Sequence, residues 1–240
     1  MLNAFENLFM TNHSCICCTK EIPDETEFSI CENCKNSLEK ISGNLCGKCG
    51  DVVPNESVKV CDYCKEKDYG FDNNFSCFYY TESSAKIIKS FKYNARKYYA
   101  KYVAELMLDS GYDFSDFDII TYVPMSLKRR KERGFNQAEE IALEISKVTN
   151  VKVLPLLIKI KEGERQAKLN QSNRMKNLIG SFAVSVDFEK EIKGKRILII
   201  DDVFTTGTTL SECSKVIVKH KPEVVKTFTF AKTKFNSPKI

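Results

Sequence analysis

Acidic residues, threonines and a glycine follow a strongly apolar tetrad near the end of the chain. Residues 197–200 lead into Asp201 and Asp202, and a threonine-rich turn then leads into a segment with helical character. Amides and hydroxyls at a helix start bind anions, and a glycine lets the backbone approach closely. Adjacent carboxylates can accept hydrogen bonds from sugar hydroxyls and help to hold Mg²⁺. We therefore predict a sugar-phosphate site, in which the phosphate is bound by Thr205, Thr206, Gly207, Thr208 and Thr209.

Other nucleotide-binding loops do not match this segment. The turn is not followed by the GK[ST] of a Walker A loop, and the chain has no GxGxxG for a dinucleotide. An acidic pair that merely flanks a helix is the remaining alternative. The order of strand, turn and helix favours the ligand site.

The first 64 residues of the chain hold nine of its 11 cysteines. Eight of the nine form four CxxC pairs, with 12 residues between the first two pairs and 11 between the last two. Zn²⁺ in structural sites prefers four thiolates in a tetrahedron, and two such pairs complete one site. We predict two structural zinc ions, with the ligands Cys15, Cys18, Cys31, Cys34, Cys46, Cys49, Cys61 and Cys64.

The spacing leaves some choices open. The CxxC pairs can combine in sequence or interleave, and His13 or Cys17 can replace a ligand beside the first pair. We expect Gly47 and Gly50 to supply the left-handed backbone that such turns need. Redox CxxC motifs come singly, so that alternative is disfavoured. The first ten residues lack a signal peptide's basic start, and no apolar run approaches the ~20 residues of a membrane span, so we expect a cytoplasmic protein.

The elements that must position these residues alternate along the rest of the chain. Apolar and aromatic patterns predict strands at 75–80, 118–123, 151–158, 196–200 and 224–231, and helices around 85–91, 99–107, 138–148 and 208–220. This alternation predicts an α/β fold with a central parallel sheet flanked by helices. Ligands of such sheets bind at the carboxyl ends of the strands. A polar stretch at 65–74 suggests two domains, a cysteine-rich module at 1–68 and the α/β domain at 69–240.

Three segments resemble known families. DDVFTTGTT at 201–209 resembles the loop with which type I phosphoribosyltransferases bind phosphoribosyl pyrophosphate. YVPMSLKRRKERGFNQAEEIA at 122–142, together with the cysteine-rich start, resembles the ComF family of competence-associated proteins. The resemblance implies a type I phosphoribosyltransferase fold with a small N-terminal double zinc ribbon.

The resemblance also implies roles for residues outside the threonine-rich turn. Asp201 and Asp202 become the ribose and Mg²⁺ carboxylates, and the loop after Val123 takes the pyrophosphate. Several cationic donors suit two phosphates. The implied pyrophosphate residues are Pro124, Arg129 and Arg130, with Arg133 as a catalytic cation and Gln166 and Arg174 on a flap.

We expect a phosphoribosyltransferase that uses phosphoribosyl pyrophosphate with Mg²⁺ and handles single-stranded DNA during natural transformation. The acceptor is not readable, although Thr205 stands where purine-salvage relatives commonly have an aspartate. A non-catalytic sensor of phosphoribosyl pyrophosphate, a DNA-binding scaffold, and a nucleotide-metabolism enzyme are the alternatives. Because the chain has no motor motif, DNA transport would require an ATP-driven partner.

Overall fold

A computed structural model describes residues 14–22, 30–93, 97–160 and 180–235. Within these ranges five strands form one parallel sheet in the order β1-β7-β6-β2-β3. The strands are β1 (Asn73–Tyr79), β2 (Ile119–Tyr122), β3 (Lys152–Val153), β6 (Arg196–Phe204) and β7 (Val224–Lys232). The predicted α/β fold with a central parallel sheet is confirmed.

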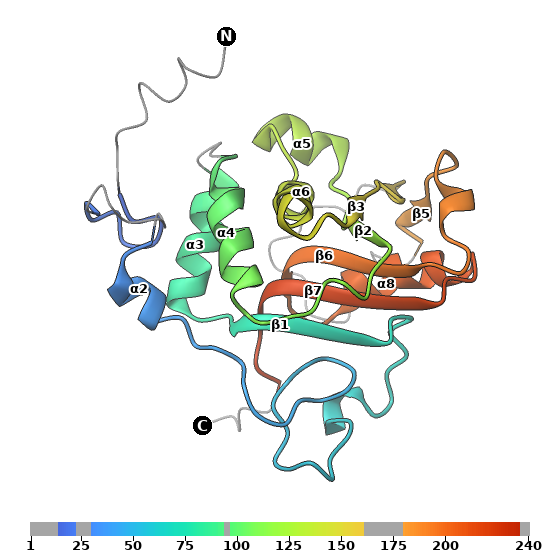
Figure 1. Cartoon of the computed structure of the whole chain (residues 1–240), viewed down its shortest axis with the longest axis horizontal. Coiled ribbons are helices and arrows are strands. Elements are labelled where there is room, and N and C mark those ends of the chain that lie inside the picture. Colours follow the sequence, from blue (N-terminus) through green and yellow to red (C-terminus); the bar gives the residue numbers. More distant parts are fainter. Residues whose placement is uncertain (1–13, 23–29, 94–96, 161–179, 236–240) are drawn as a thin grey trace.

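Helices cover both faces of the sheet (Figure 1). Helices α3 (Glu82–Tyr93), α4 (Tyr99–Leu108) and α6 (Gln137–Thr149) lie on one face, and α8 (Thr208–Val218) lies on the other. The central strand β6 contributes to both cores: Leu198 and Ile200 face the first group of helices, and Ile197 and Ile199 face α8. All four side chains are fully buried, as a strand covered on both faces requires.

The single strand predicted at 151–158 is wrong. Pro155 lies in its middle, and a proline has no N–H to donate to a sheet. The chain instead forms the two-residue β3 and then β4 (Leu157–Lys159), which pairs antiparallel with β5 (Phe182–Val184) in a separate hairpin. This hairpin lies beside α8.

A helix occupies the segment expected to be a pyrophosphate loop. Helix α5 (Leu127–Arg133) begins at Ser126, whose hydroxyl accepts from the Arg129 N–H at 3.3 Å, and ends at Gly134 with φ of 83°. Only four residues, 123–126, therefore separate β2 from α5. The expected loop is short, and its basic residues belong to a helix.

The cysteine-rich segments pack against the sheet. Short elements mark them: α2 (Glu32–Asn36) and the 3-10 helix η1 (Asp62–Cys64), while η2 (Glu189–Glu191) precedes β6. The Ile41 N–H donates to the Cys77 carbonyl at 3.1 Å, and the Asn74 N–H donates to the Lys48 carbonyl at 2.8 Å. These bonds cover the outer edge of β1, which would otherwise present unpaired backbone groups. None of the helices in the described ranges is both long enough and apolar enough to span a membrane.

Candidate functional site: two cysteine quartets and a sugar-phosphate loop

The eight predicted zinc ligands gather in two groups of four. The first quartet is Cys15, Cys18, Cys31 and Cys34, and the second quartet is Cys46, Cys49, Cys61 and Cys64. Within each quartet the sulfur atoms all lie within 4.8 Å of one another, so the pairing is sequential and not interleaved. In the first quartet the sulfurs of Cys18 and Cys31, which belong to different CxxC turns, are 3.8 Å apart. In the second quartet the sulfurs of Cys49 and Cys61 are 3.7 Å apart. A tetrahedral site with Zn–S bonds of about 2.3 Å needs sulfurs about 3.8 Å apart, so both quartets fit zinc.

The first turn of each quartet repeats the same backbone design. The N–H of Thr19 donates to the Cys15 carbonyl at 2.8 Å, and the N–H of Gly50 donates to the Cys46 carbonyl at 3.0 Å. Both donors have a left-handed backbone, with φ of 62° and 67°. The expectation for Gly50 is confirmed, whereas Gly47 does not adopt a positive φ.

Backbone amides favour the thiolate form that zinc requires. The sulfur of Cys15 accepts from the N–H groups of Cys31 and Cys17, both at 3.4 Å. Burial opposes ionisation of Cys15, but these amide bonds outweigh it and lower its pKa to about 7. Cys46 occupies the equivalent place in the second quartet, and hydrogen bonds from the other thiols, led by Cys49, lower its pKa.

Cys17 is not a member of the first quartet. Its thiol is buried and directed at the Ser83 carbonyl oxygen, 3.7 Å away on α3. Burial raises the pKa of this thiol, which opposes a thiolate there. His13, the other alternative ligand, lies outside the described residues.

The predicted phosphate loop joins β6 to α8. Gly207 has φ of 77° and immediately precedes the helix. A Cβ atom at Gly207 would lie 2.5 Å from a ring carbon of Phe204 and 2.7 Å from one of Tyr69, so only glycine fits. The hydroxyls of Thr206 and Thr208 are 2.7 Å apart and lie at the start of α8. Two hydroxyls and the first amides of a helix thus lie in the same turn, where the Thr208 N–H donates to the Thr206 hydroxyl at 3.4 Å.

Asp201 and Asp202 lie in the carboxyl-terminal half of β6, which extends beyond the predicted 196–200 to Phe204, two residues past Asp202 and directly before the threonine-rich turn. The Asp202 N–H donates to Asp201 Oδ1 at 2.9 Å, and both residues are partly buried. The Asp201 backbone is in register with Thr229 of β7. Burial raises the pKa of the Cys213 thiol on α8, and the negative charge of Asp201 raises it further. The carboxylates therefore stand at the strand edge where ligands of parallel sheets bind.

The loop after β2 reaches the same edge. Tyr122 is in register with Ile200, and the Val123 N–H donates to the Ile200 carbonyl at 3.0 Å. Residues 124–126, which include Pro124, therefore start beside Asp201. Sequence reasoning assigned no role to Asn136, whose side-chain amide donates to the Val123 carbonyl at 2.9 Å. Its position directly before a helical pattern was a signal, since asparagine is a preferred helix cap.

The candidate arginines are arranged around the first turn of α6. Arg130 pairs with Glu139 at 3.1 Å, and Glu139 also accepts from the Tyr122 hydroxyl at 3.0 Å. Arg133 donates to Gln137 at 3.2 Å, whereas Arg129 is exposed on α5. The predicted flap residues Gln166 and Arg174 lie outside the described residues.

Family comparisons agree with this arrangement. Residues 131–236 match the phosphoribosyl transferase domain, and residues 7–65 match the double zinc ribbon domain. The first match spans the phosphate loop with both carboxylates, and the second spans the two quartets.

Named relatives match most of the chain. Competence protein F of Haemophilus influenzae is 25% identical over 228 residues, which cover 92% of this chain and 97% of that protein. Competence protein ComFC of Bacillus subtilis is 26% identical over 223 residues, covering 88% and 86%. DNA utilization protein YhgH of Escherichia coli is 23% identical over 215 residues, covering 86% and 91%. The resemblance to the ComF family is thus confirmed: the chain is a homologue of these competence proteins, with a double zinc ribbon domain ahead of a phosphoribosyl transferase domain.

Proposed function

We propose that this chain binds phosphoribosyl pyrophosphate with Mg²⁺ where β2 and β6 end, and that it is a phosphoribosyltransferase. The observation that carries this proposal is the register of these two strands. Because Val123 is bonded to Ile200, the short loop after β2 starts beside the carboxylates that begin the phosphate loop. A ligand with a phosphate at one end and a pyrophosphate at the other suits two adjacent anion-binding loops.

In this proposal residues 205–209 bind the 5′-phosphate, through the amides and hydroxyls at the start of α8. Asp201 and Asp202 accept hydrogen bonds from the ribose hydroxyls. Mg²⁺, when bound, would lie near these carboxylates and neutralise charge on the pyrophosphate. Pro124 and its neighbours form the pyrophosphate loop, with Arg129, Arg130 and Arg133 as the adjacent cations.

The proposed reaction breaks the bond between C1 of the ribose and the pyrophosphate oxygen, while an acceptor nucleophile bonds to C1. The pyrophosphate leaves with the bonding electron pair, so cations near it lower the barrier. Arg133 is the candidate for this task, and its bond to Gln137 orients the guanidinium from the first turn of α6. Gln166 and Arg174 are proposed to lie on a flap that excludes water from the site.

Pyrophosphate release distinguishes turnover from sensing. We expect wild-type protein with phosphoribosyl pyrophosphate and Mg²⁺ to release pyrophosphate once the acceptor is present, and slowly by hydrolysis without it. Arg133→Ala should slow release at least tenfold, and Arg133→Lys should retain part of the rate. Unchanged release by Arg133→Ala would remove its catalytic role. Binding without any release would make the protein a sensor.

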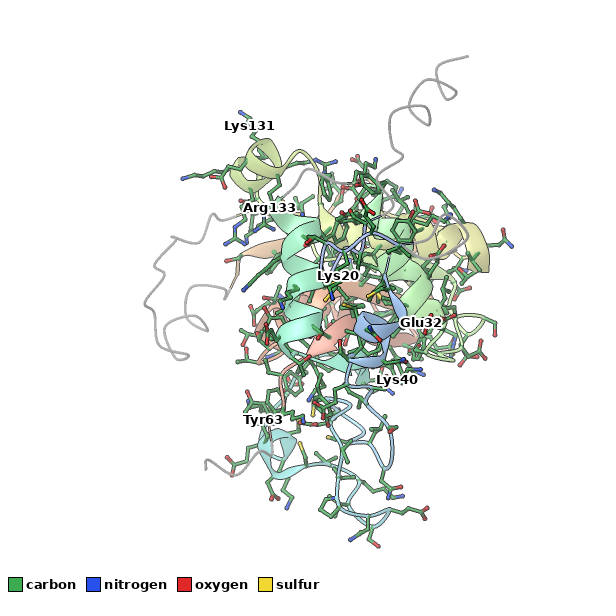
Figure 2. All side chains as sticks on the ribbon, turned by 90° about the vertical axis from the view of Figure 1, so that its left-hand side faces the viewer. Lys20, Glu32, Lys40, Tyr63, Lys131 and Arg133 are labelled. Carbon is green, nitrogen blue, oxygen red and sulfur yellow. The ribbon has the colours of Figure 1, made fainter. Side chains whose placement is uncertain are left out.

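A role in handling single-stranded DNA is the second part of the proposal, and helix α5 favours it. Five of its seven residues are basic and one is acidic, and no residue of the helix is buried. Figure 2 shows Lys131 and Arg133 at the far end of the molecule from Tyr63. Similarity to competence and DNA utilization proteins supports a nucleic-acid ligand. Tyr98 at the start of α4 is exposed and could stack on a base, whereas the neighbouring Tyr99 is buried in the core and could not.

Fluorescence anisotropy with a labelled oligonucleotide tests this role. Binding should weaken steeply with salt, since phosphate contacts release counterions. The double variant Lys128→Glu, Lys131→Glu should make the dependence of DNA affinity on salt concentration less steep. The control Lys219→Glu, at the far end of α8, should leave that dependence unchanged. Salt-independent binding would count against α5. We also propose a cytoplasmic location and an ATP-driven partner for DNA transport. The polar stretch at 65–74 supports a division into a cysteine-rich module at 1–68 and a transferase domain at 69–240.

A further inference from the structure

The two quartets have different surroundings. The first quartet lies against α3, where Cys17 and Ser37 both reach Ser83, at 3.7 Å and 2.8 Å. The second quartet belongs to the core on the opposite face, together with α8 and Phe204. Figure 2 shows Lys20, beside the first quartet, well apart from Tyr63 in the second. Among the described residues, it is therefore the second quartet that shares a packed core with the phosphate loop.

Tyr69 connects the second quartet to the turn of the phosphate loop. Its hydroxyl is 3.7 Å from the sulfur of Cys64, at hydrogen-bonding distance for a sulfur. The ring carbon Cε1, next to the carbon that carries this hydroxyl, would lie only 2.7 Å from a Cβ on Gly207. The ring also meets Phe204 edge-on, with centroids 6.2 Å apart, and the side chain is 3% exposed. One rigid, buried ring thus touches a zinc ligand and supports the turn.

A second connection runs through the end of β7. Asp51, two residues after Cys49, forms a buried ion pair with Lys232 at 2.9 Å. The next residue, Thr233, donates its hydroxyl to the Thr205 carbonyl at 2.8 Å and its N–H to the Phe204 carbonyl at 3.0 Å. The position of Thr205 in the phosphate loop therefore depends on a strand end that the second quartet's own loop clamps.

A third connection reaches the strand that carries the carboxylates. The Asn74 amide donates to the Cys49 carbonyl at 3.2 Å and to the Ser76 hydroxyl at 2.8 Å. Ser76 in turn is 2.7 Å from the Thr229 hydroxyl, and Thr229 is in register with Asp201. All of these polar groups are buried, so the chain of hydrogen bonds is costly to break.

We infer that the second quartet positions the sugar-phosphate site and that Tyr69 is the positioning residue between them. The inference rests on the proposed function, because it identifies the residues that hold the proposed phosphate loop in place. A loop held by a rigid second layer pays less ordering entropy when it binds a ligand. The Tyr69 hydroxyl contacts the sulfur of Cys64, and the Tyr69 ring packs against Gly207. Removing the hydroxyl alone or the whole ring therefore tests the two contacts separately.

Hydrogen exchange of the peptide that covers residues 204–210 tests the inference without any ligand. Tyr69→Leu should speed exchange of these amides at least tenfold, while peptides of the first quartet stay unchanged. Tyr69→Phe should keep the loop protected, since the ring remains, but one of the two zinc ions should pass faster to a chelator. Tyr112→Leu is the matched control, because Tyr112 is partly buried against the opposite core. It should leave residues 204–210 unchanged.

Wild-type exchange of residues 204–210 in Tyr69→Leu would overturn the inference, and wild-type release of both zinc ions in Tyr69→Phe would overturn its metal side. If Tyr69→Leu does not fold, Thr233→Val provides the exchange test, since it removes only the hydroxyl bond to Thr205. Failure of wild-type protein to bind phosphoribosyl pyrophosphate would reject the proposed function alone. The exchange result would still decide whether the second quartet supports the loop.

Discussion

The side-chain amide of Asn136 donates to the Val123 carbonyl at 2.9 Å, while its side-chain oxygen accepts from the Ala138 N–H at 3.2 Å. One buried side chain thus caps α6 and holds the end of β2. The cap orients the helix whose first turn carries the partners of Arg130 and Arg133. Asn136 therefore links both halves of the proposed pyrophosphate site.

Two substitutions separate these roles of Asn136. Asn136→Asp keeps an oxygen for the Ala138 N–H but sets its second carboxylate oxygen against the Val123 carbonyl, so pyrophosphate affinity should fall together with some stability. Asn136→Ala loses both bonds, and its free energy of unfolding should fall by about 1 kcal/mol for the lost cap. Urea unfolding and calorimetric titration with pyrophosphate measure the two effects. Equal affinities for wild type and Asn136→Asp would refute the loop assignment.

Gly207→Ala should damage both stability and ligand binding. An alanine there has a strained left-handed backbone, and its Cβ collides with Phe204 and Tyr69. We expect a loss of about 1–3 kcal/mol from overpacking, added to the strain. Gly194→Ala is the matched control, because Gly194 has φ of 69° but nothing within 4 Å of the added Cβ. It should show only the strain, about 1–2 kcal/mol, with no change in affinity.

The buried pair of Asp51 and Lys232 should make stability depend on acid pH. Burial alone raises the pKa of Asp51, but the Lys232 ammonium and the Phe235 N–H lower it below its ordinary value. The ionised pair therefore stabilises the fold above the unfolded pKa of about 3.9. This stability is lost as the pH falls through the lower pKa of the folded state. Urea unfolding between pH 5 and pH 2 should show a larger loss in wild type than in Asp51→Asn.

Neutral-pH stability tests the same pair. Asp51→Asn leaves the Lys232 ammonium buried without its anion, so the free energy of unfolding should fall by about 3–5 kcal/mol. Lys234→Met removes a neighbouring but exposed pair with Glu39, and should cost under about 1 kcal/mol. Similar losses for both variants would contradict the buried clamp.

Zinc content tests the choice of ligands. Elemental analysis should find two zinc ions per chain in wild type and in Cys17→Ser, because Cys17 is directed at a carbonyl of α3. Cys18→Ser removes a member of the first quartet and should leave one zinc. One zinc in Cys17→Ser together with two in Cys18→Ser would show that the first site uses the neighbouring thiol.

Local patterns predicted the parts of the fold that local chemistry decides. The apolar tetrad 197–200 is a central strand, since residues buried on both faces leave no polar alternation. Helix α5 was missed although Ser126 and Gly134 are ordinary start and stop signals, because its residues have no apolar periodicity. Pro155 was the overlooked signal that ends β3.

Tertiary features were beyond the sequence. The spacing of CxxC pairs is the same for sequential and interleaved quartets, so only the folded backbone decides between them. Lys232 and Asp51, which form a buried ion pair, are 181 positions apart in the sequence, so no local pattern predicts their contact. The different surroundings of the two quartets also depend on which face of the sheet each segment meets.

Calorimetric titration of phosphoribosyl pyrophosphate with Mg²⁺ into wild-type protein and the Asp201→Asn, Asp202→Asn double variant tests the central claim most directly. We predict that wild type binds one ligand per chain, that binding requires Mg²⁺, and that the double variant weakens it at least a hundredfold while retaining its fold and two zinc ions. No binding by wild type, or equal binding by the variant, would contradict the assignment of this site.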